Sequence, residues 1–321
     1  IIEVLLQRAK HQPNKVGYIF LNDGETESLS LSLTYQELDY QAKLLAALLR
    51  RHAHPGDRVL LIYPPGLEFI ISFFGCLYAG IVAVPVDMPR RNQRTQRLQK
   101  IVSDAQSNLI LTTQEIYPEL EESFPGSSGI KCLGTNNLEK DYLELFEPLK
   151  KISRDALAFL QYTSGSTGSP KGVMVSHGNL MHNEEMIKQA FNHSDSTIFV
   201  GWLPLFHDMG LIGNVLQPLY LGIPSYLMSP VAFLQKPIRW LKAIEKYKAT
   251  TSGGPNFAYD FCVRKITSDQ KVELDLSSWN LAFNGAEPIR SEPSVSMDLT
   301  QLLGIPATEW PKLHCLLREK D

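Results

Sequence analysis

The segment QYTSGSTGSPKGV, Gln161 to Val173, is the most informative stretch of the sequence, and it lies between two apolar runs of strand length. Its two glycines, Gly165 and Gly168, permit backbone angles that direct several amide N–H groups toward one point. Lys171 adds a mobile positive charge to the same turn. Hydroxyls, free amides and a lysine on one turn indicate a loop that binds a polyphosphate. The hydroxyl side chains are those of Thr163, Ser164, Ser166, Thr167 and Ser169.

Two other interpretations of this segment compete with a phosphate loop. Ser, Thr and Gly are common turn formers, so the segment could be a plain polar hairpin turn, although such a turn does not require so many hydroxyls and a lysine. A Walker A loop, G-x-x-x-x-G-K-[ST], fails on spacing, because Pro170 precedes Lys171 and Gly172 stands where a magnesium-binding hydroxyl belongs. A strand-like run follows the segment, so the helix dipole of the Walker loop is also missing.

On both sides of this loop, apolar runs of strand length alternate with helical patterns. Thr34 and Glu37 have the form of a capping box before a helical pattern that continues to Arg51. The alternation predicts an α/β fold with doubly wound sheets and flanking helices in two subdomains. The expected strands are Arg58–Tyr63, Ile81–Val86, Leu109–Thr112, Ala156–Tyr162, Gly172–Val175, Ile198–Leu205, Ser225–Met228, one near Thr250, and Leu281–Asn284. The other expected helices are one at the N-terminus, Phe69–Gly80, Arg94–Gln106, Leu211–Leu221 and Ile238–Lys248. Residues 114–151 carry little signal and are expected to be a junction or a surface excursion.

Composition excludes several classes of protein. The 321 residues carry a net charge of -3 with a pI near 6.3, so nothing indicates a nucleic-acid partner. A small arginine cluster is interpreted as a solvated helix face; it consists of Arg90, Arg91, Arg94 and Arg97. The four cysteines form no C-x-x-C pair and the histidines no metal-ligand spacing, so no protein-bound metal is expected.

The cysteine pattern fits a reducing compartment, and the N-terminal segment IIEVLLQRAKHQPNK does not have the form of a signal peptide. The most apolar run, Phe69–Gly80, is too short to span a bilayer. We therefore expect a cytoplasmic protein that does not span the membrane.

Three further motifs each have a structural and a functional interpretation. In WLPLFHDMGL, Trp202 to Leu211, the histidine is either structural or part of a site, and Asp208 could cap the following helix. In NGAEP, Asn284 to Pro288, the glycine and proline suit an ordinary turn after a strand. In SGGPNFAY, Ser252 to Tyr259, Asn256 could cap a helix whose aromatic residues lie in the core, or the aromatics could line a pocket for an alkyl chain.

The pattern T-S-G-[ST]-T-G-x-P-K-G is the phosphate loop of the superfamily of acyl-CoA synthetases, luciferases, nonribosomal adenylation domains and fatty acyl-AMP ligases. Thr163 to Gly172 match it at every defined position. The chain most resembles the fatty acyl-AMP ligases, from its start to about Arg290. Besides the phosphate loop, the stretches that carry this resemblance are Pro89–Gln106, Gly201–Gly222 and Trp279–Arg290.

The resemblance implies ATP and Mg²⁺ as cofactors and assigns roles residue by residue. Lys171, His207 and Thr163 are the implied catalytic residues. The implied nucleotide-binding residues are Thr163, Ser164, Gly165, Ser166, Thr167, Gly168 and Lys171, with Gly285, Ala286, Glu287 and Pro288 against adenine. The implied acid-binding residues are His207, Met209, Gly210, Gly254, Asn256 and Phe257. By this resemblance, residues 1–150 are a first subdomain, 151–290 a second with the phosphate loop and the acyl and adenine sites, and 291–321 an atypical tail.

After Arg290 the sequence no longer follows the family. The Y-G-x-[AT]-E segment, the T-G-D aspartate and the C-terminal domain with its catalytic lysine do not appear, so we expect a truncated chain with a poorly packed tail. The implied reaction joins a fatty acid to ATP, giving acyl-AMP and pyrophosphate, for an acyl carrier protein or a downstream synthase. An acyl-CoA synthetase and a non-catalytic binding remnant of a synthase are the alternatives.

Overall fold

The computed structural model describes eight stretches of the chain. They are residues 1–26, 30–88, 95–124, 129–149, 152–163, 170–272, 274–286 and 312–315. The chain divides into two units that interleave along the sequence. The first unit consists of Ile1–Lys15, Leu33–Glu185 and Leu205–Asp208, and the second of Val16–Ser32, Met186–Pro204 and Met209–Asp321.

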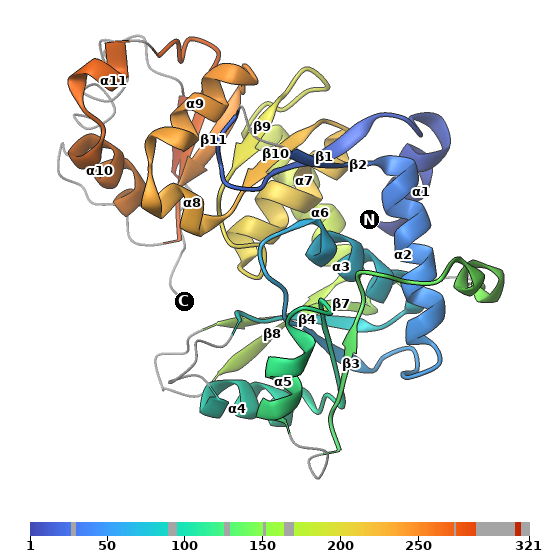
Figure 1. The fold of residues 1–321 in the computed structure, drawn as a ribbon. Coiled ribbons are helices and arrows are strands. Elements are labelled where there is room, and N and C mark those ends of the chain that lie inside the picture. Colours follow the sequence, from blue (N-terminus) through green and yellow to red (C-terminus); the bar gives the residue numbers. More distant parts are fainter. Residues whose placement is uncertain are drawn as a thin grey trace. The chain divides into compact units, whose positions relative to one another are not determined.

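The first unit is built on a six-stranded sheet with helices packed against it (Figure 1). Its strands are parallel except for the last pair, β7 and β8, which is antiparallel. Across the sheet they run β6 (Lys131–Gly134), β5 (Leu109–Thr112), β3 (Arg58–Leu61), β4 (Val82–Pro85), β7 (Leu157–Thr163) and β8 (Lys171–Ser176). Its helical segments are α1 (Ile2–His11), α2 (Tyr35–Leu49), α3 (Leu67–Ala79), α4 (Thr95–Ala105), α5 (Tyr117–Ser123), the 3-10 turn Lys140–Leu145 and most of α6 (His177–Ala190).

Local signals set the starts of these elements. Helix α2 begins with the predicted capping box, because the Thr34 hydroxyl accepts the amide of Glu37 at 3.2 Å and the Glu37 carboxylate accepts the amide of Thr34 at 2.8 Å. Strands β3, β4 and β5 are buried almost throughout, as expected of parallel strands covered on both faces. The predicted α/β class with helix-flanked sheets is confirmed.

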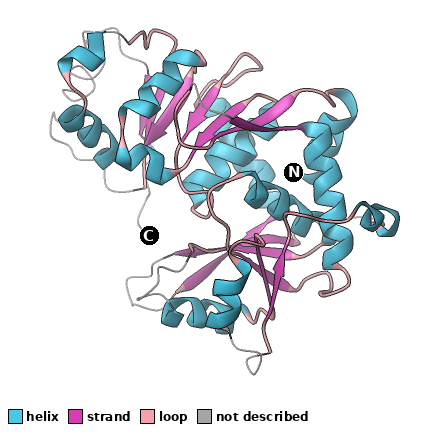
Figure 2. Ribbon diagram, viewed as in Figure 1, coloured by secondary structure: helices cyan, strands magenta, loops and turns pink. Residues whose placement is uncertain are grey.

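The second unit is built on a seven-stranded sheet, and Figure 2 shows strands and helices alternating through it as in the first unit. Its order is β13 (Lys312–Cys315), β12 (Leu281–Asn284), β11 (Thr251–Gly254), β9 (Phe199–Gly201), β10 (Ser225–Met228), β1 (Val16–Leu21) and β2 (Ser30–Thr34). The helical segments are the π-helix Met209–Leu216, α7 (Gln217–Leu221), α8 (Pro230–Gln235), α9 (Ile238–Lys246), α10 (Asn256–Lys265) and α11 (Ser268–Val272).

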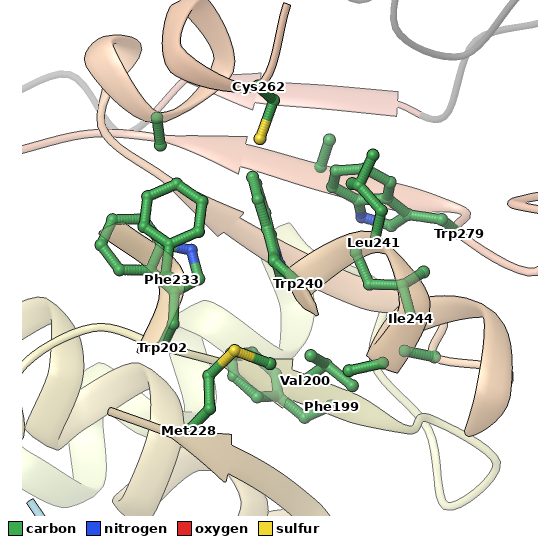
Figure 3. Packing of buried hydrophobic residues seen from close by; sticks show 14 of the residues in the cluster. Phe199, Val200, Trp202, Met228, Phe233, Trp240, Leu241, Ile244, Cys262 and Trp279 are labelled. Atoms are coloured by element: carbon green, nitrogen blue, oxygen red, sulfur yellow. The ribbon is translucent and has the colours of Figure 1, made fainter. Parts of the chain in front are cut away.

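An aromatic cluster fixes α8 and α9 on this sheet (Figure 3). The ring of Trp202 stacks on that of Phe233 with centroids 4.0 Å apart, and Trp240 meets both edge-on. Trp240 is fully buried, and its indole N–H donates to the Ser252 hydroxyl on β11 at 2.7 Å. Burying a large apolar side chain contributes about 1.5–3 kcal/mol, and the hydrogen bond also fixes the orientation of this one.

The structure corrects several predicted elements. Strand β9 ends at Gly201 rather than Leu205, because the chain turns away through Pro204, which has no amide to continue a ladder. The helix expected at Leu211–Leu221 begins at Met209 as a π-helix. Segment 114–151, expected to be a junction or an excursion, supplies α5 and the edge strand β6.

The division of the chain into residues 1–150, 151–290 and 291–321 stays a prediction. The two units of the structure interleave along the sequence. Of the tail, only residues 312–315 are described; they form β13, which pairs in parallel with β12. Of the arginine cluster, Arg97 is described and is exposed on α4. None of the helices in the described part of the chain has the length and apolar content needed to cross a membrane.

Candidate functional site

The predicted phosphate loop connects the two strands of a β-hairpin. Strands β7 and β8 pair in antiparallel register with Thr163 directly opposite Lys171, and Lys171 is exposed. Predicted residues Ser164, Gly165, Ser166, Thr167 and Gly168 lie outside the described residues. The two strands expected on either side of the predicted loop are confirmed, and Lys171 is the first residue of the second strand.

A tyrosine anchors the hairpin at its base. The Tyr162 hydroxyl donates to the Asp104 carboxylate on α4 at 2.5 Å. Burial, followed by this bond to a negatively charged group, raises the pKa of the Tyr162 hydroxyl above its usual range. Tyr162 therefore stays a neutral donor that ties the strand before the loop to a neighbouring helix.

The segment that carries His207 is held against the same strand. Gln161, which is buried, donates its side-chain amide to the backbone carbonyl of Phe206 at 3.1 Å, although 45 residues separate the two. This bond places His207 within one residue of a contact with β7, two positions from Thr163. The structure thus joins the segment that carries His207 to strand β7, and the roles of His207, Thr163 and Lys171 in one site stay a prediction.

His207 is itself half exposed, and its Nδ1 lies 2.5 Å from a carboxylate oxygen of Asp208. A carboxylate next to an imidazole restrains the orientation of the ring. The helix-capping role considered for Asp208 stays a prediction.

The chain turns sharply immediately after this histidine. A Cβ atom on Gly210 would lie 1.9 Å from the carbonyl oxygen of Pro204, so only glycine fits this close approach. The π-helix that begins at Met209 follows from this turn, and such helices are frequent at functional sites. Met209 and Gly210 therefore have a structural role in this turn, in addition to the acid-binding role that the resemblance implies for them.

In the second unit, the predicted acid-binding and adenine-binding residues lie at the carboxyl ends of two paired strands. Gly254 at the end of β11 pairs with Asn284 at the end of β12, and Gly285 follows directly. In open parallel sheets, ligands bind outside the carboxyl ends of the strands. A Cβ atom on Gly254 would come 2.7 Å from the Trp202 ring, so the glycine lets the indole lie against the strand.

Two buried amides join these strand ends. The Asn284 side-chain N–H donates to the Asn256 side-chain oxygen at 2.6 Å, and both side chains are buried. Asn256 is the first residue of α10, and Pro255 occupies the N-cap position, so Asn256 is not the helix cap considered from the sequence. Its side chain points inward and holds Asn284 instead of an α10 amide.

The aromatic residues of α10 divide between two environments. Tyr259 is fully buried and donates its hydroxyl to the Phe283 carbonyl at 2.7 Å. Phe257 is 43% exposed and meets the Trp202 ring edge-on at 6.0 Å. Tyr259 is therefore core, whereas Phe257 presents an apolar face outward, as a wall residue would.

The segment after β12 carries backbone strain. Ala286 has a φ of +69°, a left-handed conformation that costs a residue with a side chain about 1 kcal/mol. Such conformations cluster where a backbone must present its polar groups in one direction. Glu287 and Pro288, the other residues assigned to adenine, lie outside the described residues.

Sequence reasoning missed three residues of this arrangement: Gln161, Asp104 and Asn284 as the partner of Asn256. All three lie within stretches that the sequence singled out, namely Gln161–Val173, Pro89–Gln106 and Asn284–Pro288, so their position was the available signal. Metal ligation is not preformed in the described residues, where no three of His, Cys, Asp and Glu side chains come together. Cys76, Cys132 and Cys262 are free thiols.

Comparison with known proteins identifies the family of the chain. The profile of the family described as AMP-binding enzyme matches residues 5–304. The medium-chain-fatty-acid–[acyl-carrier-protein] ligase JamA of Moorena producens is 47% identical over 298 residues, which cover 91% of this chain and 50% of JamA. The corresponding ligase TtuA of Teredinibacter turnerae is 36% identical over 90% of this chain and 51% of its own length.

A solved structure of a fatty acyl-adenylate ligase from L. pneumophila, in complex with acyl adenylate and pyrophosphate, superposes with a TM-score of 0.86. It is 44% identical, and the match covers 94% of this chain and 52% of that one. The chain thus spans about half the length of the relatives that it matches.

Proposed function

The chain belongs to the AMP-binding enzyme family, and from this premise we propose that it is the nucleotide-binding and acid-binding part of an enzyme that converts a fatty acid and ATP to acyl-AMP and pyrophosphate. The acyl group would then pass to the thiol of an acyl carrier protein. The observation that carries the proposal is the similarity to JamA over nearly the whole chain. Its physical support is the hairpin that joins Thr163, Lys171 and the His207 segment.

The chemistry requires two anions to meet. A carboxylate oxygen of the fatty acid attacks the α-phosphorus of ATP, forming a new P–O bond, while the bond to the β-phosphate breaks and pyrophosphate leaves with the electron pair. Charge neutralisation and orientation are therefore the main tasks of the protein. Lys171 and the loop hydroxyls are assigned to the β- and γ-phosphates, and His207 to the border of the carboxylate.

The second unit is assigned to the adenine and the acyl chain. The strained backbone at Ala286 and its neighbour Gly285 would present amide and carbonyl groups to the base edge. Phe257, with Trp202 behind it, would give an apolar wall for methylenes, each worth about 0.8 kcal/mol when buried. Gly254 and Asn256 would shape this wall from the ends of their elements.

Magnesium fits this assignment as an ion carried by the nucleotide. Mg²⁺ is commonly held by substrate phosphates with one or two carboxylates, and the described residues hold no cage of their own for it. When bound, it would supply positive charge to the phosphates. We further propose a cytoplasmic location, in keeping with the reduced cysteines.

Mass spectrometry after incubation with ATP, Mg²⁺ and a medium-chain fatty acid tests the proposal. Both the chain and, where its gene extends further, the complete product should be assayed, with and without CoA and a holo acyl carrier protein. Acyl-AMP that persists with CoA but is consumed by the carrier protein is the expected result. Conversion to acyl-CoA would identify an acyl-CoA synthetase instead, and no adenylate from either protein would leave a binding remnant.

A further inference from the structure

A groove with an apolar floor and a basic rim runs along α9. It consists of two adjoining hollows of about 390 and 420 Å³, which share Lys236, Ile238 and Gln270. Helices α8, α9, α10 and α11, drawn close together in Figure 1, contribute the lining of these hollows. We call this feature the α9 groove.

The floor of the α9 groove is anchored in the core. Ile238 and Ile266 are only 2% and 5% exposed, and the ring of Phe261 packs edge-on against the core residue Phe233 at 5.9 Å. Leu274 adds a partly buried apolar side chain at the other end. An apolar floor held by the core does not collapse when the groove is empty, so it is preformed for an apolar ridge.

The rim of the α9 groove is positively charged. Four lysines line it, namely Lys236, Lys242, Lys246 and Lys265. Lys236 is paired with the Glu25 carboxylate at 3.0 Å, so the uncompensated charge of the rim comes from other lysines. The carboxylate among the lining residues, Glu245, already accepts the backbone amide of Asp275 at 2.8 Å. Within the described ranges, no hydrogen bond or ion pair engages Lys242 or Lys265.

The positions of the lysines along the rim indicate which kind of partner the α9 groove would bind. Lys242 and Lys246 are four residues apart on α9 and therefore lie on one helix face, opposite the buried Trp240 and Ile244. Lys265 belongs to the other hollow. A single small anion would contact few of these lysines, whereas an amphipathic helix carries several carboxylates beside an apolar ridge and matches both the basic rim and the apolar floor.

We propose that the α9 groove docks an acidic, amphipathic helix of the carrier protein that receives the acyl group. This inference rests on the proposed function, which makes the acceptor a protein. Complementary charge at a rim steers encounter and orients the partner, so the groove sets affinity for the carrier and leaves adenylate formation unaffected.

The test is the double variant Lys242→Glu/Lys265→Glu, compared with the wild-type protein and with Lys140→Glu, an exposed lysine of the first unit. Fluorescence anisotropy of a labelled holo acyl carrier protein gives its Kd for each, with NaCl varied. The double variant should raise this Kd about tenfold and flatten its salt dependence, with acyl-AMP formation in the absence of carrier unchanged. Lys140→Glu should bind as the wild type does.

An unchanged Kd in the double variant, or an equal loss in Lys140→Glu, would overturn the docking proposal. So would full displacement of the carrier by a free fatty acid, since the groove would then be a lipid site. Failure of the wild-type protein to form acyl-AMP is a separate result, because it refutes the proposed function while the binding measurement needs no turnover.

Discussion

Thr163 and Lys171 face each other across the β7–β8 ladder, the last residue of one strand directly opposite the first residue of the next. Paired residues in an antiparallel ladder have their Cα atoms about 4.5–5.5 Å apart. The exposed side chain of Lys171 therefore lies at the same end of the hairpin as Thr163, the first hydroxyl residue of the predicted phosphate loop.

Replacing Lys171 by Ala removes the charge without removing packing, because this side chain is exposed. A hydrogen bond to a charged group is worth about 1.5–3 kcal/mol, so we expect the Kd for ATP to rise about tenfold to a hundredfold. Isothermal titration calorimetry measures the change, with Lys140→Ala as the control. Equal ATP affinity in Lys171→Ala and wild type would refute the loop assignment.

Replacing Gly210 by Ala tests the turn after His207. The added Cβ would lie 1.9 Å from the Pro204 carbonyl oxygen, so the backbone must shift at a cost of about 1–3 kcal/mol in the free energy of unfolding. Gly213 in the same π-helix has nothing within 4 Å of an added Cβ, so Gly213→Ala is a matched control that should be neutral or slightly stabilising. Urea denaturation that gives both variants the same stability would count against this geometry.

How well the sequence predicts the structure depends on how far apart along the chain the interacting residues lie. Strands Leu109–Thr112, Ser225–Met228 and Leu281–Asn284 were expected with the bounds that they have, because continuous apolar runs between breakers are local signals. Helix α6 was missed because Leu180 and Glu184 are its only buried residues in the described structure, so it shows little apolar periodicity.

The same limit applies to the candidate site. The hairpin was visible because its strands and loop are contiguous. The contacts that hold the site are not local, since Gln161 reaches Phe206 over 45 residues and Asn284 reaches Asn256 over 28. No periodicity or spacing rule joins such pairs, so they become visible only once the sheets are assembled.

The buried amide pair gives a second stability prediction. Asn256→Ala removes the acceptor of the Asn284 side-chain N–H. The side-chain oxygen of Asn284 is already buried without a partner among the described residues. Leaving a buried polar group unpaired costs about 1–3 kcal/mol, so the free energy of unfolding should fall by that amount. Asn280→Ala, at an exposed position nearby, should change it by less than about 0.5 kcal/mol in the same chemical denaturation experiment. A small effect of Asn256→Ala would mean that water replaces the lost acceptor.

The buried side chain of His177 makes the stability of the protein depend on pH. Burial lowers the pKa of His177 at the start of α6 to about 4, below its value of 6.5 in an unfolded chain. Between these two values the unfolded chain binds more protons than the folded one, so stability is full above pH 6.5 and falls as the pH drops toward 4. Unfolding curves at pH 7.5, 5.5 and 4.5 should show a smaller loss in His177→Gln than in wild type. Parallel losses in the two proteins would show that other groups carry the effect.

The position of β1 between β10 and β2 has a consequence for how the protein is made. The Tyr18 hydroxyl on β1 donates to the carbonyl of Val215, which lies 197 residues later in the chain. Ribosomes add about 5–20 residues per second, so β1 waits on the order of 10–40 s before its partner strand is synthesised. During that interval an apolar strand is exposed to solvent and to other nascent chains. The sheet of the second unit can therefore be completed only late in synthesis, whereas the strands of the first unit, which end at Ser176, can begin to assemble earlier.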